Sequence, residues 1–274
     1  MGCLSPSLVR LAEWVDQSTG EYHKKLIFNP NTIDDNTFLL PCGKCVNCQK
    51  DKSIEWSYRL MNELEMNNNV GLFITLTYRD DPVNVCKRDV QLFLKRLRRR
   101  LEPQKVRYFA SGEYGERFTR PHYHLLIFGL KLDDLKFYKK DKKGNKLYTS
   151  KFIDELWPFG FHSIGFINQY TCLYTAHYMQ KFYKLPDGLE KPFYLMSSHP
   201  GIGYDFFVKN QHLVDSDKLY VHGDYRKLPR YYLKICVKLG IDLTELLENR
   251  KQNSCLDFRS RDMIRQKIEH DLLK

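Results

Sequence analysis

The chain has 274 residues, enough for one sizeable catalytic core with small appendages or for two modest domains. Hydrophobic residues make up 42% and charged residues 28%, which excludes a disordered or collagen-like chain, and no apolar run approaches the roughly 18 residues needed to cross a bilayer. A net charge of +11 favours a polyanionic partner such as nucleic acid, although scattered lysines on any basic protein give the same total. We expect a cytoplasmic protein.

The N-terminal part, residues 1–60, resembles an irregular leader. It contains Cys42, Cys45 and Cys48 in a C-x2-C-x2-C pattern within a turn-rich segment. In a reducing compartment this spacing indicates metal ligation before disulfides. After this segment, apolar spacing over 54–66 predicts a helix.

The central part begins with LFITLTY at 72–78, whose apolar and β-branched residues predict a buried strand. Apolar residues from Val90 to Leu101 then recur at helical spacing and predict an amphipathic helix. A charged helix face is often merely solvated, but a strongly basic one also suits DNA phosphates. The candidate DNA-binding residues on this face are Lys95, Arg96, Arg98, Arg99 and Arg100.

Two further strands are predicted at 105–112 and 121–129, and the short connection between them favours a hairpin. The later elements are an exposed insertion or long hairpin over 131–150, a short helix over 151–157, a strand over 161–167, a helix over 170–184, loops over 196–204, and helical patterns over 229–239 and 255–273.

This order of elements predicts an α+β fold: a central antiparallel sheet of about five strands with helices on one face, plus a small N-terminal cysteine knuckle. We place the boundaries at 1–66 for the knuckle and its helix, 67–190 for the core, and 191–274 for a C-terminal accessory region.

His122 and His124 stand two apart in the predicted strand PHYHLLIF, so both side chains point to the same face. Two imidazoles on one strand make half of a metal site, and a carboxylate is a usual companion. Glu113 at the neighbouring strand end is the preferred third ligand, with Glu116 as the alternative. Such pairs are also common as packed or surface histidines, as zinc ligands, or as general acid and base.

On the helix over 170–184, Tyr170, Tyr174 and Tyr178 recur every four residues, and Lys181 follows on nearly the same stripe. Tyrosines at this spacing often pack against a sheet with their hydroxyls at the rim. A catalytic interpretation requires a phenol aimed at a phosphate and a cation to stabilise the phenolate, since the phenol has a pKa of about 10 in water. Lys181 could supply that cation.

Together these motifs resemble the HUH endonuclease superfamily, in which a histidine pair around a bulky residue holds a divalent metal and a tyrosine on a later helix cuts single-stranded DNA. Cys3, PCGKCVNC at 41–48, GEYGERFTRPHYHLLIFG at 112–129 and the two-tyrosine helix are similar to the replication initiators of gokushovirus-type microviruses, which are small single-stranded DNA phages. The similarity covers roughly residues 1–185. His177 departs from the family, since related two-tyrosine initiators often carry a lysine there.

The resemblance implies an HUH, ferredoxin-like nickase fold and a rolling-circle initiator. Mg²⁺ or Mn²⁺ bound by His122, His124 and Glu113 would fix the scissile phosphate. Tyr174 or Tyr178, assisted by Lys181, would form a 5′-phosphotyrosine link and free a 3′-OH. The implied setting is the cytoplasm of a bacterial host, with single-stranded or locally melted origin DNA and the host replication helicase or polymerase as partners.

The resemblance also makes Cys3 the fourth ligand of a structural Zn²⁺ with Cys42, Cys45 and Cys48. An iron–sulfur cluster or no metal at all are the alternatives, and Lys52 stands where a ferredoxin-type run would place a cysteine. Two other functions stay open: a plasmid relaxase or transposase with the same chemistry, and a non-catalytic, zinc-containing nucleic-acid-binding protein.

Overall fold

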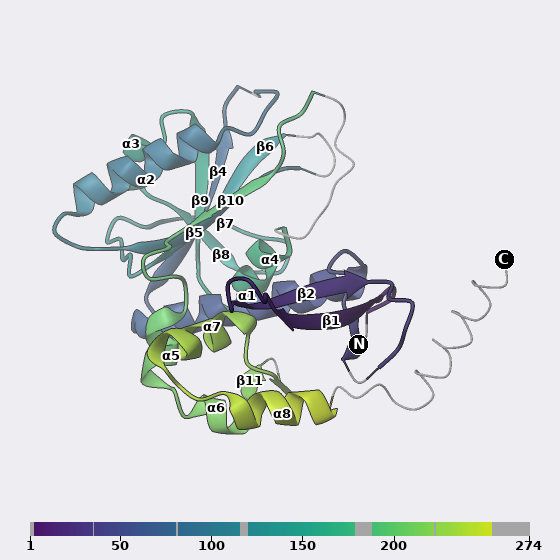
Figure 1. Ribbon diagram of the computed structural model, residues 1–274. Coiled ribbons are helices and arrows are strands. Elements are labelled where there is room, and N and C mark those ends of the chain that lie inside the picture. Colours follow the sequence, from purple (N-terminus) through teal and green to yellow (C-terminus); the bar gives the residue numbers. More distant parts are fainter. Residues whose placement is uncertain are drawn as a thin grey trace. The chain divides into compact units, whose positions relative to one another are not determined.

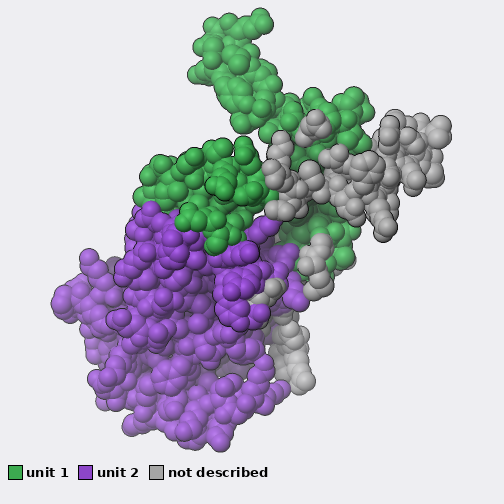
Figure 2. All heavy atoms as spheres, turned by 90° about the horizontal axis from the view of Figure 1, so that it is seen from below, with its two compact units in different colours: residues 1–49, 214–217, 233–274 green, residues 50–213, 218–232 purple. Residues whose placement is uncertain are grey.

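The computed structural model describes residues 3–34, 36–80, 82–115, 120–178, 188–221 and 223–253. The chain divides into two compact units, which are coloured separately in Figure 2. The first contains residues 1–49, 214–217 and 233–274, and the second contains residues 50–213 and 218–232. No helix among the described residues is long and apolar enough to span a membrane.

The second unit is built on a seven-stranded sheet in the order β10-β5-β6-β4-β9-β8-β7, with every neighbouring pair antiparallel. Its strands are β4 (Gly71–Tyr78), β5 (Arg107–Tyr114), β6 (Pro121–Phe128), β7 (Lys136–Lys140), β8 (Lys146–Thr149), β9 (Gly160–Phe166) and β10 (Phe193–Met196). The predicted antiparallel α+β class is confirmed, and the β5–β6 hairpin is present, but the expected count of about five strands is too low.

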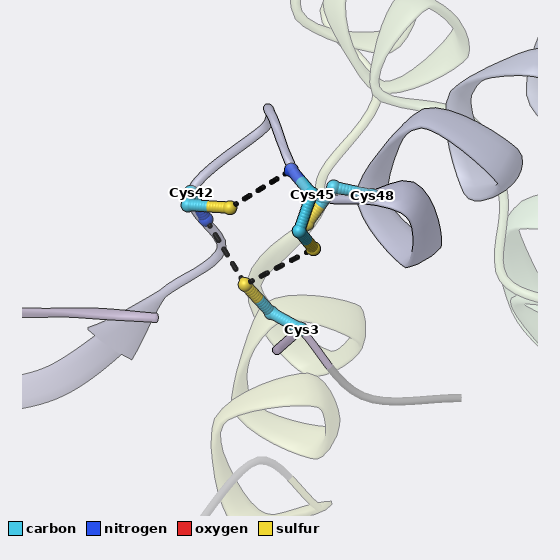
Figure 3. A group of neighbouring side chains, drawn as sticks. All are labelled: Cys3, Cys42, Cys45 and Cys48. Carbon is cyan, nitrogen blue, oxygen red and sulfur yellow. Dashed lines mark hydrogen bonds between the residues drawn. The ribbon is translucent and has the colours of Figure 1, made fainter. Parts of the chain in front are cut away.

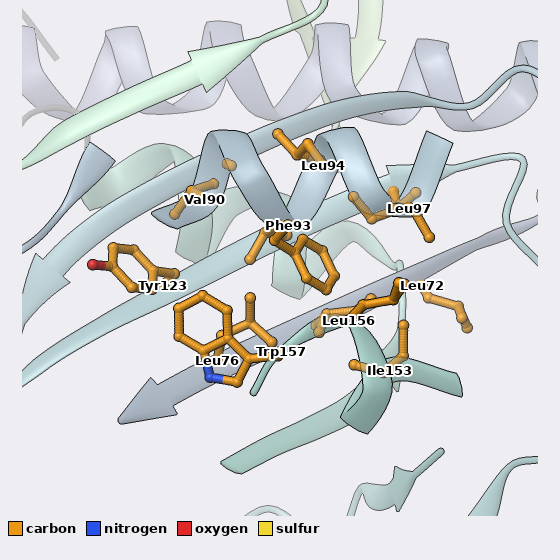
Figure 4. Close-up of a cluster of buried hydrophobic side chains, with 14 of the residues drawn as sticks. Leu72, Leu76, Val90, Phe93, Leu94, Leu97, Tyr123, Ile153, Leu156 and Trp157 are labelled. Atoms are coloured by element: carbon orange, nitrogen blue, oxygen red, sulfur yellow. The ribbon is translucent and has the colours of Figure 1, made fainter. Parts of the chain in front are cut away.

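Helices α2 (Lys87–Leu101) and α3 (Lys151–Leu156) pack on one face of this sheet (Figures 1 and 4). Because side chains alternate between the two faces along β4, Leu72 and Leu76 both point to that face. There they pack in one core with Phe93 and Trp157. Tyr123 lies in the same core, and its hydroxyl is satisfied by the Tyr78 hydroxyl at 2.7 Å and the Cys86 amide at 2.7 Å.

The opposite face is also covered, by α1 (Val46–Met66) and α4 (Gln169–Tyr178) (Figure 1). Leu60 of α1 and Ala176 of α4 are fully buried in one cluster with Leu126 and Phe128 of β6. The prediction of helices on one face is therefore wrong. The physical reason lies in β6, whose consecutive apolar residues 125–128 require cover on both sides.

In the first unit, residues expected to form an irregular leader make a three-stranded antiparallel sheet in the order β2-β1-β3. Its strands are β1 (Ser7–Val15), β2 (Tyr22–Phe28) and β3 (Thr37–Leu40). Trp14 and His23 lie opposite each other in this sheet and their rings stack at 5.4 Å. The expectation of an irregular leader is wrong because cross-strand pairing orders a segment with little apolar alternation.

The remaining elements follow β10. They are α5 (Tyr204–Lys209), α6 (Leu213–Ser216), β11 (Leu219–Val221), β12 (Asp224–Arg226), α7 (Arg230–Leu239) and α8 (Thr244–Asn253). The predicted helix over 229–239 is confirmed as α7. The helix predicted over 255–273 lies outside the described residues, and the predicted domain boundaries stay a prediction.

Candidate active site

The two histidines and Glu113 lie on neighbouring strands in a register that brings them together. Glu113 of β5 stands opposite His122 of β6, and Ser111 stands opposite His124. Because the side chains alternate faces along each strand, these four share one face of the sheet. This is the face that α1 and α4 cover, opposite to Tyr123.

Glu113 contacts both imidazoles with a single carboxylate oxygen. Its Oε1 lies 2.9 Å from His122 Nε2 and 2.9 Å from His124 Nε2. Glu113 and His124 are buried, and His122 is partly exposed. Among the described residues, Glu113 Oε2 and Ser111 Oγ are buried without a hydrogen-bond partner. A buried carboxylate oxygen left in this state is costly unless a cation or water completes it.

The three residues fit a divalent cation. One imidazole nitrogen from each histidine and one carboxylate oxygen lie within 4.8 Å of one another. Two histidines and one carboxylate form a donor set that divalent metals accept, and it leaves coordination positions open for a substrate. The unpartnered Glu113 Oε2 is a second feature that a cation at this site would satisfy. Glu116, the alternative ligand, lies outside the described residues.

Hydrogen bonds at the far ring nitrogens fix both imidazoles. His122 Nδ1 lies 3.0 Å from the Arg120 carbonyl oxygen, and His124 Nδ1 lies 3.1 Å from Thr75 Oγ1. Such partners leave each Nε2 directed at Glu113 and orient the ring for a metal. Thr75 is a site residue that was not predicted from the sequence. Its signal was the period-two placement of polar residues in LFITLTY, on the face away from the leucines.

The two histidines differ electrostatically. Burial of His122 opposes the charged form, but the hydrogen bond and charge of Glu113 outweigh it and raise the pKa of His122 above its ordinary value. Complete burial dominates at His124 and lowers its pKa. His124 is therefore held as a neutral imidazole, the form that binds metal.

The tyrosine helix brings Tyr174 to this centre. The ring of Tyr174 lies 5.2 Å from the ring of His124 in a perpendicular arrangement, and Phe73 lies beside both. Cys172 and Ala176 bury the inner side of α4 against the sheet. Tyr178 is the last residue of α4, but its side chain and Lys181 lie outside what the structure describes.

The basic helix α2 lies on the opposite face of the sheet from the histidines. Arg96 donates to the Leu156 carbonyl oxygen at 2.7 Å, Arg100 pairs with Glu155 at 3.1 Å, and Arg98 lies over the Tyr108 ring. Lys95 and Arg99 are exposed. The predicted contact of α2 with DNA stays a prediction. Any such contact would lie on the face of the sheet opposite to the His-His-Glu triad.

A second group of side chains that could hold a metal ion lies in the first unit, where the residues before β1 meet the turn after β3 (Figure 3). The Sγ atoms of Cys3, Cys42, Cys45 and Cys48 all lie within 4.8 Å of one another. Gly43 takes a φ of 70°, which the tight turn between the first two ligands of the C-x2-C-x2-C run requires.

Backbone amides stabilise thiolates in this cluster. Amides of Cys48 and Leu4, the largest contributions, lower the pKa of Cys45 to about 6. Amides of Lys44 and Cys45 lower the pKa of Cys42. Burial raises the pKa of Cys48 to about 12. Four converging sulfurs with amide donors match a closed tetrahedral metal site.

The fold and these two centres define an antiparallel α+β protein with a His-His-Glu triad beside a helical tyrosine. Residues 71–183 match the family described as Replication-associated protein ORF2/G2P. The chain is 34% identical to Replication-associated protein ORF2 of Spiroplasma virus 4 over 222 residues, which cover 74% of this chain and 69% of the relative.

Two further phage proteins are similar. Replication-associated protein VP4 of Bdellovibrio phage phiMH2K is 31% identical, with 72% of this chain and 67% of the relative covered. Replication-associated protein ORF4 of Chlamydia phage 1 is 28% identical, with 74% and 55% covered. No solved structure matches. The chain belongs to the replication-associated protein ORF2/G2P family, so the resemblance read from the sequence is confirmed.

Proposed function

We propose that the protein nicks and rejoins single-stranded DNA at a replication origin through a covalent 5′-phosphotyrosine intermediate. The observation that carries the proposal is the Tyr174 ring 5.2 Å from His124, which shares one oxygen of Glu113 with His122. A nucleophile beside a three-ligand centre is the arrangement that metal-assisted phosphoryl transfer requires. Family membership supports a role in phage replication.

In this proposal His122, His124 and Glu113 hold Mg²⁺ or Mn²⁺. When bound there, the cation supplies Lewis-acid polarisation of the scissile phosphate and charge stabilisation for the leaving oxygen. The residues themselves do the positioning. Thr75 and the Arg120 carbonyl oxygen set the ring orientations, and burial keeps His124 neutral.

Tyr174 is the proposed first nucleophile, because it is the tyrosine that the described part of α4 directs to His124. Its phenolic oxygen forms a bond to phosphorus, and the bond from phosphorus to the 3′ oxygen breaks. The phenol proton goes to solvent, and the released 3′ oxygen takes up a proton to become the 3′-OH. That hydroxyl can prime synthesis by the host replication machinery.

Tyr178 is the proposed second nucleophile. It lies one helical turn after Tyr174, about 6 Å along the helix surface, and could take over the 5′ phosphate in the next round. The first 3′-OH could then rejoin by the reverse reaction, which conserves the phosphodiester bond energy. Lys181 is the proposed cation for the phenolate.

The four cysteines are the proposed ligands of a structural Zn²⁺. Four ligands close the coordination sphere and leave no position for a substrate, which suits a folding role. This metal would stabilise the N-terminal unit and take no part in the reaction.

Adduct formation tests the proposal. The protein is incubated with labelled single-stranded oligonucleotides that tile the phage genome, with and without Mn²⁺, and separated under denaturing conditions. We expect a Mn²⁺-dependent covalent adduct that Tyr174→Phe reduces at least about 10³-fold.

An adduct that survives in the Tyr174→Phe/Tyr178→Phe double variant would remove both tyrosines as nucleophiles. No adduct with any oligonucleotide would favour a non-catalytic nucleic-acid-binding protein. An adduct that forms only on plasmid or transposon-end DNA would favour the relaxase or transposase alternative.

A further inference from the structure

Ser111 occupies a fourth position beside the three residues of the His-His-Glu triad. It lies two residues before Glu113 on β5 and directly opposite His124 of β6. Because Glu113 in turn lies opposite His122, the four side chains form a two-by-two block on one face of the sheet. Three of these positions hold a residue that could bind a cation, and the proposed reaction gives Ser111 no role.

The Ser111 hydroxyl is buried, and it has no hydrogen-bond partner among the described residues. The residue as a whole is only 3% exposed. A buried hydroxyl in this state costs folding free energy, which an alanine of nearly the same size would avoid. Packing against the neighbouring elements therefore does not explain why this position carries a hydroxyl.

The neighbouring imidazole does not serve Ser111. His124 has Thr75 Oγ1 at 3.1 Å from its Nδ1 and Glu113 Oε1 at 2.9 Å from its Nε2, so both ring nitrogens are directed at other groups. Thr75 stands on β4, on the far side of β6 from Ser111.

Glu113 Oε2 is a second buried polar atom of this block without a partner among the described residues. Both imidazoles contact the other oxygen of the carboxylate, Oε1. Glu113 Oε2 and Ser111 Oγ can each accept a hydrogen bond, and they belong to side chains two apart on one face of one strand. A single group with two hydrogens to donate would satisfy both atoms.

Side-chain length indicates what this group is. The serine Oγ is bonded directly to Cβ, whereas Nε2 of histidine and Oε of glutamate stand at the ends of longer side chains. The Ser111 hydroxyl therefore lies closer to the backbone than a cation held by the triad, and one water can bridge the difference. Mg²⁺ usually keeps several waters as ligands when it binds a protein, and such a water has two hydrogens to donate.

We propose that Ser111 is a positioning residue of the metal centre, whose hydroxyl and Glu113 Oε2 accept the two hydrogen bonds of one water ligand of the cation. The inference rests on the proposed function, because the cation is the one assigned to the triad. Ser111 orients this ligand and the Glu113 carboxylate together, as outer partners do in other metal sites. No bond is made or broken, and the hydroxyl keeps its proton.

Metal binding in the absence of DNA tests this role. The electron paramagnetic resonance signal of free Mn²⁺, followed in a titration of the whole protein, gives the dissociation constant. Glu113→Gln defines the binding that occurs elsewhere on the chain. Ser111→Ala should raise the dissociation constant at the triad about tenfold, at the lower end of the effect of losing an orienting partner. Unchanged Mn²⁺ affinity in Ser111→Ala would overturn the proposal.

Two further variants show whether the hydroxyl itself matters. Ser111→Thr keeps the hydroxyl on a residue that strands favour, and its dissociation constant should stay within about threefold of the wild type. Ser163→Ala is the matched control, because Ser163 lies in the same row of the sheet as His124 but two strands away from β6. It should bind Mn²⁺ as the wild type does. The proposal fails if Ser111→Thr loses as much affinity as Ser111→Ala, or if Ser163→Ala does.

Thermal melts separate this role from a role in packing. Without Mn²⁺, Ser111→Ala should melt at or above the wild-type temperature, because it removes a buried hydroxyl that no protein group satisfies. Saturating Mn²⁺ at one fixed concentration should raise the melting temperature of the wild type more than that of the variant. A variant that is already less stable without metal would assign the hydroxyl to the fold and reject the proposal.

The same measurements distinguish this inference from the proposed reaction. If Ser111→Ala weakens Mn²⁺ binding but the wild type forms no covalent adduct with DNA, the role of Ser111 stands and the proposed chemistry fails. If the adduct forms and Ser111→Ala binds Mn²⁺ normally, only the role of Ser111 fails. A wild type that binds no Mn²⁺ above the Glu113→Gln background would reject both the metal centre and the role of Ser111.

Discussion

The chain carries two clusters of side chains that could hold metal ions, and the fold assembles the two in different ways. The register of two long strands brings Glu113 to His122 and His124, within a sheet covered on both faces. The cysteine cluster is assembled from the chain start, a turn and the first turn of α1. The first has three donors and an unpartnered buried oxygen, and the second has four sulfurs.

The number of ligands determines which role each cluster can have. A centre with open positions can accept a substrate oxygen, whereas a closed four-sulfur centre can only hold the chain together. Strand register positions side chains independently of any metal, so the triad should form in its absence. If the cysteine cluster binds Zn²⁺ as proposed, metal binding and folding of this loop should be coupled.

The largest expected effect comes from Glu113→Gln. The amide has nearly the same shape but is a poor metal ligand, so loss of several kcal/mol of metal-derived stabilisation should slow adduct formation on the order of 10³-fold. Folding should change much less, because the amide has the shape of the carboxylate and keeps a hydrogen-bonding oxygen beside the two imidazoles. Adduct rates at several Mn²⁺ concentrations and a thermal melt measure the two effects. A variant that forms adduct at the wild-type rate would exclude Glu113 as a ligand.

Cys45→Ser should have the opposite pattern of effects: a large loss of stability and a small change in the rate of adduct formation. Removal of one sulfur should cost several kcal/mol of metal-coupled folding free energy and lower the melting temperature by about 10 °C. Zinc content, measured on the purified protein, should fall by one equivalent. The adduct rate per folded molecule should stay within about tenfold of the wild type. The matched control is Cys86→Ser, at a half-buried cysteine outside the cluster, which should retain its zinc. A Cys45→Ser variant with full zinc content would contradict the structural role.

Thr75→Val should weaken metal binding at the triad, with a smaller effect on adduct formation than Glu113→Gln and no effect on the cysteine cluster. The change keeps the shape but removes the hydrogen bond to His124 Nδ1, and loss of such an orienting partner typically weakens metal binding about 10–100-fold. The readout is the Mn²⁺ concentration that gives half-maximal adduct formation, with the rate at saturating metal nearly preserved. Thr75→Ser retains the hydroxyl and should restore the wild-type value. A rate loss that excess Mn²⁺ does not recover would assign Thr75 another role.

The sequence predicted the triad because its geometry is local. Period-two alternation placed His122 and His124 on one face, and a short hairpin connection brought Glu113 opposite His122 on the same face. The cysteine cluster was only partly predictable from residues alone. The C-x2-C-x2-C run supplies three ligands, but no spacing rule joins Cys3 to a turn nearly forty residues later, and only the family resemblance included it.

Parts of the fold were missed for identifiable reasons. β10 has four residues, too few to show a period, and it forms only because the edge of β5 accepts it. The strands β1 and β2 mix charged and apolar residues without clean alternation. The run of apolar residues from Leu125 to Phe128 was a sign that this strand is covered on both faces. One apolar run alone, however, does not distinguish a fully buried strand from other buried segments.

The smallest expected effect comes from substitutions in the basic helix α2. They should change DNA binding but not the rate of the reaction. Lys95 and Arg99 are exposed on the face of the sheet opposite to the triad, so they can contact only DNA that extends beyond the reaction centre. Lys95→Gln/Arg99→Gln should weaken binding of an oligonucleotide of about 30 nucleotides by a fewfold and reduce the dependence of log affinity on log salt by about 1.4. Adduct formation at saturating DNA should not change, and an oligonucleotide of about 8 nucleotides should bind as before. If the short oligonucleotide is affected as strongly as the long one, the strand passes over α2 close to the cleavage site, and the separation of the two faces does not hold.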